Sequence, residues 1–151
     1  MVTVRTAGID DYPAIVWLRR QWADERFGPA DDPEFDAAAL TWLAEQSAQR
    51  TCFVAESDGE VVGFVTMLVA ERMPLPGKDG GRWGYINHLY VSATHRRGGI
   101  AQELVAATIG FGREQRYERI LVHPNEQSAD LFAASGFGAA DDLRVLPLAS
   151  T

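Results

Sequence analysis

The sequence predicts a single α/β domain, residues 1–151, in which helices flank a mixed, mostly antiparallel sheet. A length of 151 residues suits one domain with a substantial core. A composition of 46% hydrophobic and 23% charged residues is typical of a globular protein. Stretches with strand and helix periodicity alternate along the chain, which predicts the element order β-α-α-β-β-β-α-β-α-β.

A short strand and two helices come first. Residues 2–5 are the expected strand, and Asp10 or Asp11 caps the helix that follows, because an aspartate there accepts hydrogen bonds from free helical N–H groups. A second helix is expected to begin at Asp32-Pro33 and to run to about residue 49.

Two paired strands come next in the sequence. Residues 51–56 and 61–70 flank Ser57-Asp58-Gly59-Glu60, in which the Asp-Gly pair predicts a hairpin turn. The second of these strands is apolar on both faces, so we expect it to be central in the sheet. Residues 73–81 hold two prolines and three glycines and are expected to form a loop.

The second half of the chain predicts three more strands and two helices. Its long helix should bury Ile100, Leu104, Val105 and Phe111 on one face. The expected ranges are strands at 83–92, 118–123 and 143–148, the long helix at 99–115 and a short helix at 127–134.

Charge and cysteine content exclude several classes of protein. A formal net charge of −7 argues against general binding to nucleic acid or anionic lipid. No apolar run approaches the ~20 residues that cross a bilayer, and the N-terminal stretch lacks the pattern of a secretory signal. Cys52, the single cysteine, reads as a core residue, and no residues have zinc-ligand spacing, so we expect a cytoplasmic protein without a metal.

The turn from Arg96 to Ala101 is the strongest functional signal. It lies between a predicted strand and a predicted helix, where the first helical N–H groups lack partners and the helix dipole favours negative charge. Bare glycine backbone can close around an anion there, and two arginines add positive charge. A pyrophosphate would suit this turn, although the pattern is neither that of a P-loop nor that of a dinucleotide fold.

The same turn resembles a known family signature. Arg96-x-x-Gly99-x-Ala101 is similar to the Gln/Arg-x-x-Gly-x-Gly/Ala motif of the GCN5-related N-acetyltransferases (GNAT). Asn125-Glu126-Gln127-Ser128 and Gly136-Phe137 resemble the family's later Asn-x-x-Ala and Gly-Phe landmarks, in the right order. The resemblance covers nearly the whole chain and implies a GNAT-like fold that uses acetyl-CoA as its cofactor.

The resemblance also implies roles for particular residues. Backbone groups of Leu89, Tyr90 and Val91 would contact the acetyl and pantetheine part of acetyl-CoA. Asn125 would border the pantetheine arm, with capping of the next helix as the alternative. The pyrophosphate would be held by Arg96, Arg97, Gly98, Gly99, Ile100 and Ala101.

The catalytic residues are less well defined, because the strand around Asn87 has no carboxylate where relatives often have glutamate. The resemblance places catalytic groups at Tyr85 and Asn87, which strand alternation puts on one face with Ile86 and His88 on the other. A β-bulge near His88 would reverse that assignment. A histidine ordinarily has a pKa near neutrality, so His88 is a candidate general base.

Other sources of the proton transfers stay open. His123 is a second candidate base, and a chain of waters could serve instead. Phe132 stands where family members often have a tyrosine, and phenylalanine cannot donate a proton. The thiolate would then leave as an anion or take its proton from water or another side chain, unless the protein is a poor catalyst.

The expected acceptor is a primary amine of a small molecule or peptide. An acidic cluster could attract a cationic amine, although acids also cap helices and solvate surfaces. The cluster comprises Asp24, Glu25, Asp31, Asp32, Glu34 and Asp36, and the aromatic residues that could line an acceptor pocket are Trp17, Trp22, Trp42 and Trp83. A second copy in a homodimer is the other candidate partner. The alternative function is a catalytically silent acyl-CoA-binding or protein-interaction module with the same fold.

Overall fold

The computed structural model describes residues 1–149 and contains one five-stranded sheet. The strands lie in the order β1-β2-β3-β4-β5, antiparallel except for the parallel pair β4 and β5. Helix α3 makes the crossover between these two parallel strands. The strands are β1 (Val2–Thr6), β2 (Arg50–Ser57), β3 (Glu60–Glu71), β4 (Arg82–Val91) and β5 (Arg119–Val122).

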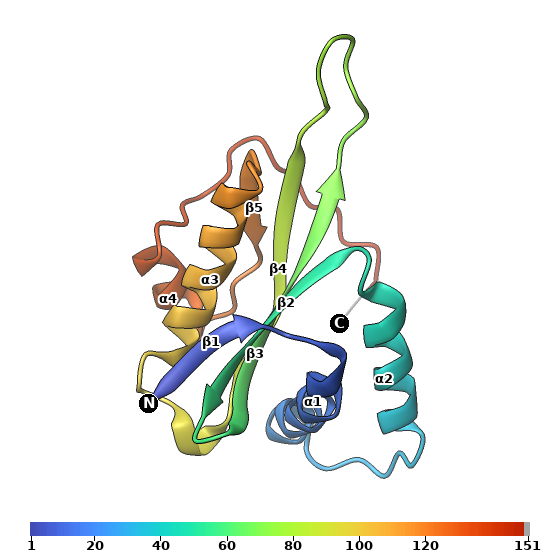
Figure 1. The fold of residues 1–151 in the computed structure, drawn as a ribbon, viewed down its shortest axis with the longest axis vertical. Helices are drawn as coiled ribbons and strands as arrows, with labels where there is room; N and C mark the ends of the chain where they lie inside the picture. Colours follow the sequence, from blue (N-terminus) through green and yellow to red (C-terminus); the bar gives the residue numbers. More distant parts are fainter. Residues whose placement is uncertain (150–151) are drawn as a thin grey trace.

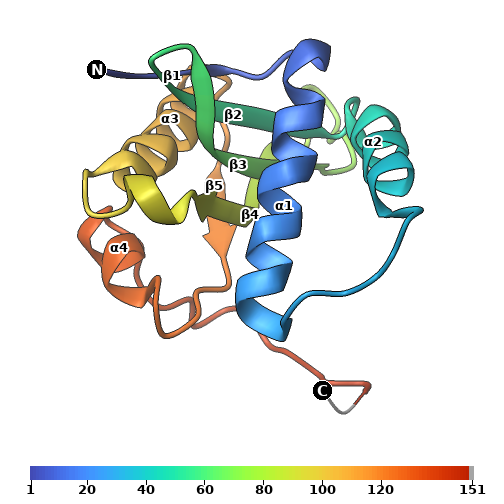
Figure 2. The ribbon, with the colours of Figure 1, turned by 90° about the horizontal axis from the view of Figure 1, so that it is seen from below.

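Helices cover both faces of the sheet (Figures 1 and 2). Helices α1 (Tyr12–Phe27) and α2 (Phe35–Gln46) pack on one face, and α3 (Ile100–Glu114) and α4 (Ala129–Ala134) pack on the other. Each layer has its own apolar cluster, because successive side chains of a strand point to opposite faces. The first contains Leu18, Val54 and Phe64, and the second contains Val65, Met67, Ile86 and Leu104.

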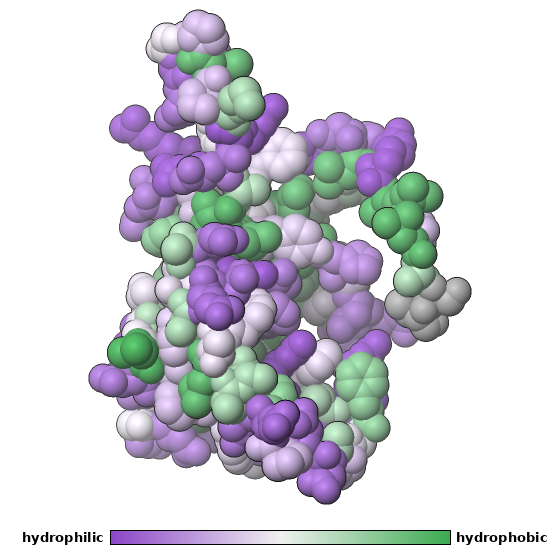
Figure 3. Space-filling view, turned by 90° about the vertical axis from the view of Figure 1, so that its right-hand side faces the viewer, coloured by the Kyte–Doolittle hydropathy of each residue, from purple (hydrophilic) through white to green (hydrophobic). Residues whose placement is uncertain are grey.

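The predicted hairpin between β2 and β3 is confirmed. Asp58 and Gly59 both have positive φ, 50° and 80°, as the two central residues of a type I′ hairpin turn require. Strand β3 pairs with β2 and β4, so it is central as predicted. The hairpin between β3 and β4 projects from the body as a knob of mixed hydropathy (Figure 3).

Helix α2 is shorter than the sequence predicts. It begins at Phe35 instead of Asp32-Pro33 and ends at Gln46 instead of residue 49. The Asp32 carboxylate accepts a hydrogen bond from the Glu34 N–H (3.1 Å), and its carbonyl accepts one from the Phe35 N–H (3.3 Å). These two bonds make a turn that precedes the helix.

The predicted last strand, residues 143–148, is wrong. The structure has irregular chain there, with 79% of Leu146 exposed, and Pro147 cannot donate to a strand ladder. An ion pair between Arg119 and Asp142 (2.6 Å) holds the chain just before this segment. Figure 3 shows the apolar segment standing off from the body where it leads to the grey terminal residues. Strand β5 is therefore the edge of the sheet.

Candidate active site

A β-bulge in β4 decides which side chains face α1 and α2. Thr66 pairs with Asn87 and Phe64 pairs with Tyr90, so Val65 lies opposite two residues. His88 has a φ of 62°, in the left-handed region that non-glycine residues rarely adopt. The bulge places His88 on the same face as Asn87 and Tyr90. Simple strand alternation would put Asn87 and His88 on opposite faces.

Strands β4 and β5 separate where the bulge begins. They pair from Trp83 to Ile86 on β4, whereas β4 continues to pair with β3 up to Val91. A cavity of about 260 Å³ opens where β5 leaves β4, and we call it the strand-split cavity. Its lining residues are Arg19, Trp22, Phe64, Ile86, Asn87, His88, Leu89, Tyr90, Val122, His123, Asn125, Ser128 and Phe132.

The turn that precedes α3 has the backbone of an anion site. Arg97 and Gly99 both have positive φ, 68° and 82°, and Gly99 is the N-cap of α3. Within residues 1–149, the N–H groups of Gly99, Ile100, Ala101 and Gln102 donate to no acceptor. A Cβ atom added to Gly99 would meet nothing within 4 Å. Free donors therefore face open space at the positive end of a 15-residue helix.

Arg96 does not add free charge to this turn. Its Nη2 donates to Glu25 Oε2 on α1 (2.6 Å), and its Nε donates to the Val91 carbonyl (3.0 Å). The Tyr90 hydroxyl donates to the other oxygen of Glu25. Burial opposes ionisation of Glu25, but the hydrogen bonds from Tyr90 and Arg96 outweigh it and lower the Glu25 pKa. Of the two arginines, only Arg97 forms no ion pair in the described part of the chain.

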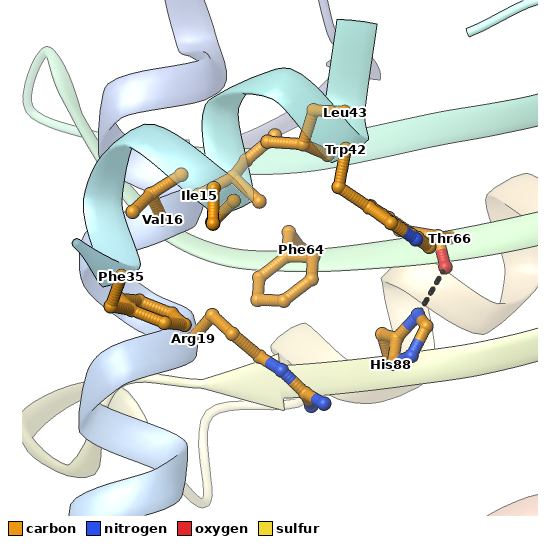
Figure 4. Close-up of a pocket in the computed structure, with 11 residues that line it drawn as sticks. Ile15, Val16, Arg19, Phe35, Trp42, Leu43, Phe64, Thr66 and His88 are labelled. Atoms are coloured by element: carbon orange, nitrogen blue, oxygen red, sulfur yellow. Dashed lines mark hydrogen bonds between the residues drawn. The ribbon is translucent and has the colours of Figure 1, made fainter. Parts of the chain in front are cut away.

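A second cavity, of about 360 Å³, lies between α1, α2 and the sheet, and we call it the helix-side cavity (Figure 4). It shares Arg19, Phe64 and His88 with the strand-split cavity, so the two spaces meet at His88. Its lining residues are Ile15, Val16, Arg19, Phe35, Ala38, Ala39, Trp42, Leu43, Phe64, Thr66 and His88.

The hydrogen bonds of Thr66 define the tautomer of His88. Thr66 Oγ1 lies 2.8 Å from the Asn87 carbonyl oxygen, 3.0 Å from Asn87 Oδ1 and 3.0 Å from His88 Nδ1. Both Asn87 oxygens can only accept, so the single hydroxyl proton goes to one of them. We therefore assign the proton to His88 Nδ1, which donates to Thr66 and leaves Nε2 as the proton acceptor.

Two arginines influence His88. Burial, followed by the positive charges of Arg19 and Arg50, lowers the His88 pKa to about 4, so the ring is neutral at pH 7. Arg50 donates to Asn87 Oδ1 (2.7 Å) and to Gln46 Oε1 (3.0 Å), and its guanidinium lies over the Trp42 ring. Asn87 is thus held by Arg50 and Thr66.

Some predicted residues lie at these cavities and others do not. Asn125 borders the strand-split cavity, and its Oδ1 also accepts the Ser128 N–H (2.9 Å), so the capping contact is present. Phe132 and His123 line the same cavity. Tyr85 is 38% exposed and lines neither cavity.

Three of the six residues of the acidic cluster have other partners. Glu25 binds Arg96, Asp32 makes the turn before α2, and Asp36 pairs with Arg20 (2.9 Å). Neither cavity has an aspartate or glutamate among its lining residues. Trp22 and Trp42 each line a cavity, whereas Trp17 and Trp83 line neither.

Sequence reasoning missed Arg19 and Thr66. They come from α1 and β3, which are far apart in the sequence, so no short motif joins them. A signal for Arg19 did exist, because it follows Ile15 and Val16 by four and three residues and therefore shares their helix face. A basic residue on an apolar helix face points to a polar function within the core.

Three further findings limit the chemistry of the described residues. Burial raises the Cys52 pKa to about 12, which keeps that thiol protonated. Over residues 1–149, no group of three or more His, Cys, Asp or Glu side chains could hold a metal ion. In the same part of the chain, every helix is too short or too polar to cross a bilayer.

Solved structures share this fold over the whole chain. A predicted acetyltransferase from Clostridium acetobutylicum, in a structure with acetyl-CoA, has a TM-score of 0.76 at 21% identity, covering 98% of this chain and 97% of that one. A ribosomal-protein-alanine N-acetyltransferase from Brucella melitensis biovar Abortus 2308 has a TM-score of 0.75 at 22% identity, with full coverage of both chains. At these identities the likeness shows the fold.

Curated relatives and a family model define the family. N-acetyltransferase 8 of Homo sapiens is 38% identical over 112 residues, which are 74% of this chain and 46% of the relative. Probable N-acetyltransferase family 8 member 5 of Mus musculus is 38% identical over 94 residues, which are 60% of this chain and 40% of the relative. The chain thus spans less than half the length of both relatives. The sequence model of the acetyltransferase (GNAT) family matches residues 14–137, and the chain therefore belongs to this family.

Proposed function

We propose that this protein is an acetyl-CoA-dependent N-acetyltransferase, which moves an acetyl group to a primary amine by direct attack of the amine on the thioester. The observation that carries the proposal is the row of free N–H groups from Gly99 to Gln102, beside the split between β4 and β5. The family and the neighbour with acetyl-CoA support the same assignment.

The residues around the split fit acetyl-CoA. The N–H groups at the start of α3, with Arg97, would hold its pyrophosphate, because anions bind at helix N-termini. The edge of β4 from Leu89 to Val91 has no strand partner on the β5 side, so its backbone groups would bind the pantetheine arm. Acetyl-CoA would supply a thioester carbonyl as the electrophile and a thiolate as the leaving group.

His88 would be the general base in this proposal. Its Nε2 has no proton in the assigned tautomer, and the residue lies where the two cavities meet. The amine proton would pass to Nε2 as the new C–N bond forms. Phe132 lines the cavity without a proton to give, so the thiolate would leave as the anion and be protonated in solvent.

A silent acyl-CoA-binding module is the second candidate. Phe132 in place of the family's frequent tyrosine, and the low pKa of His88, both favour weak catalysis. This candidate predicts binding of acetyl-CoA without turnover.

The test combines a binding measurement with a thiol-release assay. Coenzyme A should raise the melting temperature, and mixing the protein with acetyl-CoA and a panel of primary amines should release free thiol. Binding without thiol release across the panel would support the silent module. No binding of coenzyme A at all would overturn both.

A further inference from the structure

The helix-side cavity carries positive charge in an otherwise acidic protein. The chain has a formal net charge of −7, yet no acid lines this cavity and Arg19 does. Arg50 lies beside it, stacked on the Trp42 ring with its guanidinium 4.7 Å from the ring centroid. Over residues 1–149, neither Arg19 nor Arg50 forms an ion pair, whereas Arg5, Arg20, Arg72, Arg96 and Arg119 all do.

Arg19 is the arginine that remains available to a ligand. Arg50 already donates to Gln46 and Asn87, but Arg19 donates no hydrogen bond to any described residue. The Arg19 guanidinium packs over the Trp22 ring, 4.0 Å from its centroid, and burial lowers the Arg19 pKa. An arginine stays charged even so, and the Arg19 N–H groups are left free to donate to an anionic ligand.

The position of Arg19 limits where that acceptor would lie. Arg19 and His88 both point into the space beside the Phe64 ring, where the two cavities meet (Figure 4). An anionic group bound by Arg19 would therefore share this space with an amine at His88. The rest of the helix-side cavity is apolar and aromatic, with Phe35, Trp42 and Leu43 in its wall.

We propose that the acceptor is a primary amine that carries a carboxylate beside the amine and an apolar group beyond it, as an apolar α-amino acid does. The Arg19 guanidinium binds the carboxylate, and the apolar group fills the space between Phe35, Trp42 and Leu43. This inference rests on the proposed transferase function and names the substrate class of the same site.

The electrostatics around His88 are consistent with this acceptor. A carboxylate beside Arg19 offsets one of the two charges that depress the His88 pKa, so a bound acceptor makes Nε2 more basic. A cationic acceptor would instead bring further positive charge to the two guanidinium groups. A cationic amine attracted by the acidic cluster would also meet no acid in the lining of the helix-side cavity.

The test uses pairs of amines that differ only in the carboxylate. L-phenylalanine is compared with 2-phenylethylamine, and L-leucine with 3-methylbutylamine. In the wild type, kcat/KM should be at least roughly 30-fold higher for the amino acid of each pair, the size of effect that a charge-assisted bidentate hydrogen bond gives. Equal use of both members of each pair would overturn the inference and leave the transferase function intact.

Arg19→Gln is the decisive variant, and Arg20→Gln is its matched control. Arg20 is the next residue of α1 and pairs with Asp36 outside the cavities. Arg19→Gln should remove most of the preference for the amino acid and leave the KM for acetyl-CoA within about twofold, whereas Arg20→Gln should change neither. A raised acetyl-CoA KM with an unchanged amine preference would show that Arg19 serves the cofactor, and would overturn the inference.

A binding measurement keeps the inference testable without turnover. N-acetyl-L-phenylalanine, the product of one pair, should bind in calorimetry, and Arg19→Gln should weaken this binding at least roughly 10-fold. Absence of thiol release with this binding present would count against the transferase and for the site. Absence of any heat in the wild type would overturn the site.

Discussion

The turn before α3 and the helix-side cavity both favour anions, but they are built in opposite ways. The turn uses backbone N–H groups from four consecutive residues, Gly99 to Gln102. The cavity uses side chains from α1, α2, β3 and β4, among them Arg19, Trp42 and His88. Main-chain geometry depends little on which side chains are present, whereas a cavity wall changes with each substitution. In our proposal the turn serves the shared cofactor, and the cavity selects the acceptor.

The largest effect should come from His88→Ala, which changes the helix-side cavity and leaves the turn before α3 intact. Loss of the general base should lower kcat about 100-fold, because base catalysis contributes at least this much. The Kd for acetyl-CoA should stay within about threefold of the wild-type value, because the turn before α3 is unchanged. Steady-state kinetics and calorimetry check the two values. An unchanged kcat would assign the proton transfer to water or to His123.

His88→Ala should also change how the free energy of unfolding depends on pH. Folding lowers the His88 pKa from 6.5 to about 4, so the unfolded chain binds more protons between these pH values. The free energy of unfolding therefore contains a His88 contribution that is complete above pH 6.5 and is lost as the pH falls toward 4. His88→Ala should show a shallower loss of stability over this range in urea titrations. Parallel curves for both proteins would contradict the buried, neutral histidine.

Gly99→Val should disrupt the turn before α3 and raise the Kd for acetyl-CoA about 30-fold. Valine strains the positive φ of 82°, and its side chain occupies the open space in front of the free N–H groups. Gly77→Val is the control, because Gly77 has the same φ in the distant β3–β4 hairpin and an equally open surrounding. Both variants should lose similar stability, and only the first should lose affinity in calorimetry. Equal affinities would rule out the turn as the pyrophosphate site.

Glu25→Gln should give the smallest effect. It tests whether the contact of α1 with Arg96 couples the helix-side cavity to the turn before α3. Glu25 on α1 holds Arg96 and Tyr90, so α1 and the anion turn share one ion pair. The pair is partly exposed, so its loss should weaken acetyl-CoA binding only about threefold and lower the melting temperature by a few degrees. Asp24→Asn removes the same charge one residue earlier and should change neither in thermal-shift titrations. A stronger binding of acetyl-CoA by Glu25→Gln would mean that Arg96, once released, serves the anion directly.

Local sequence patterns predicted the parts of this molecule that local forces determine. Asp58-Gly59 specifies its hairpin turn, and the apolar positions of α3 specify its buried face. The glycines before α3 indicated free main chain at the correct place. The alternation of strand and helix periodicity predicted the order of the elements, which the fold confirms as far as α4.

Long-range contacts account for what the sequence could not predict. The bulge at His88 depends on the pairing of β4 with β3, and no glycine marks its positive φ. Arg96 was predicted to hold the anion, and no local pattern indicates its hydrogen bond with Glu25, which lies 71 residues earlier. Residues 143–148 have the apolar pattern of a strand but form none. Pro147 cannot donate to a strand ladder, and the leucines of this segment find no apolar surface to pack on and stay exposed.

The early parting of β4 and β5 has a consequence for how a long, narrow ligand would enter. The two strands are joined by only four residue pairs, and the groups beyond them are already released from each other. A ligand lying there would replace water at these backbone groups without breaking any strand pairing. Once bound, it would lie beside β4 where a strand would otherwise pair, and it would stabilise the contact between β4 and β5. The last third of the chain would then be held most firmly when the protein is ready to react.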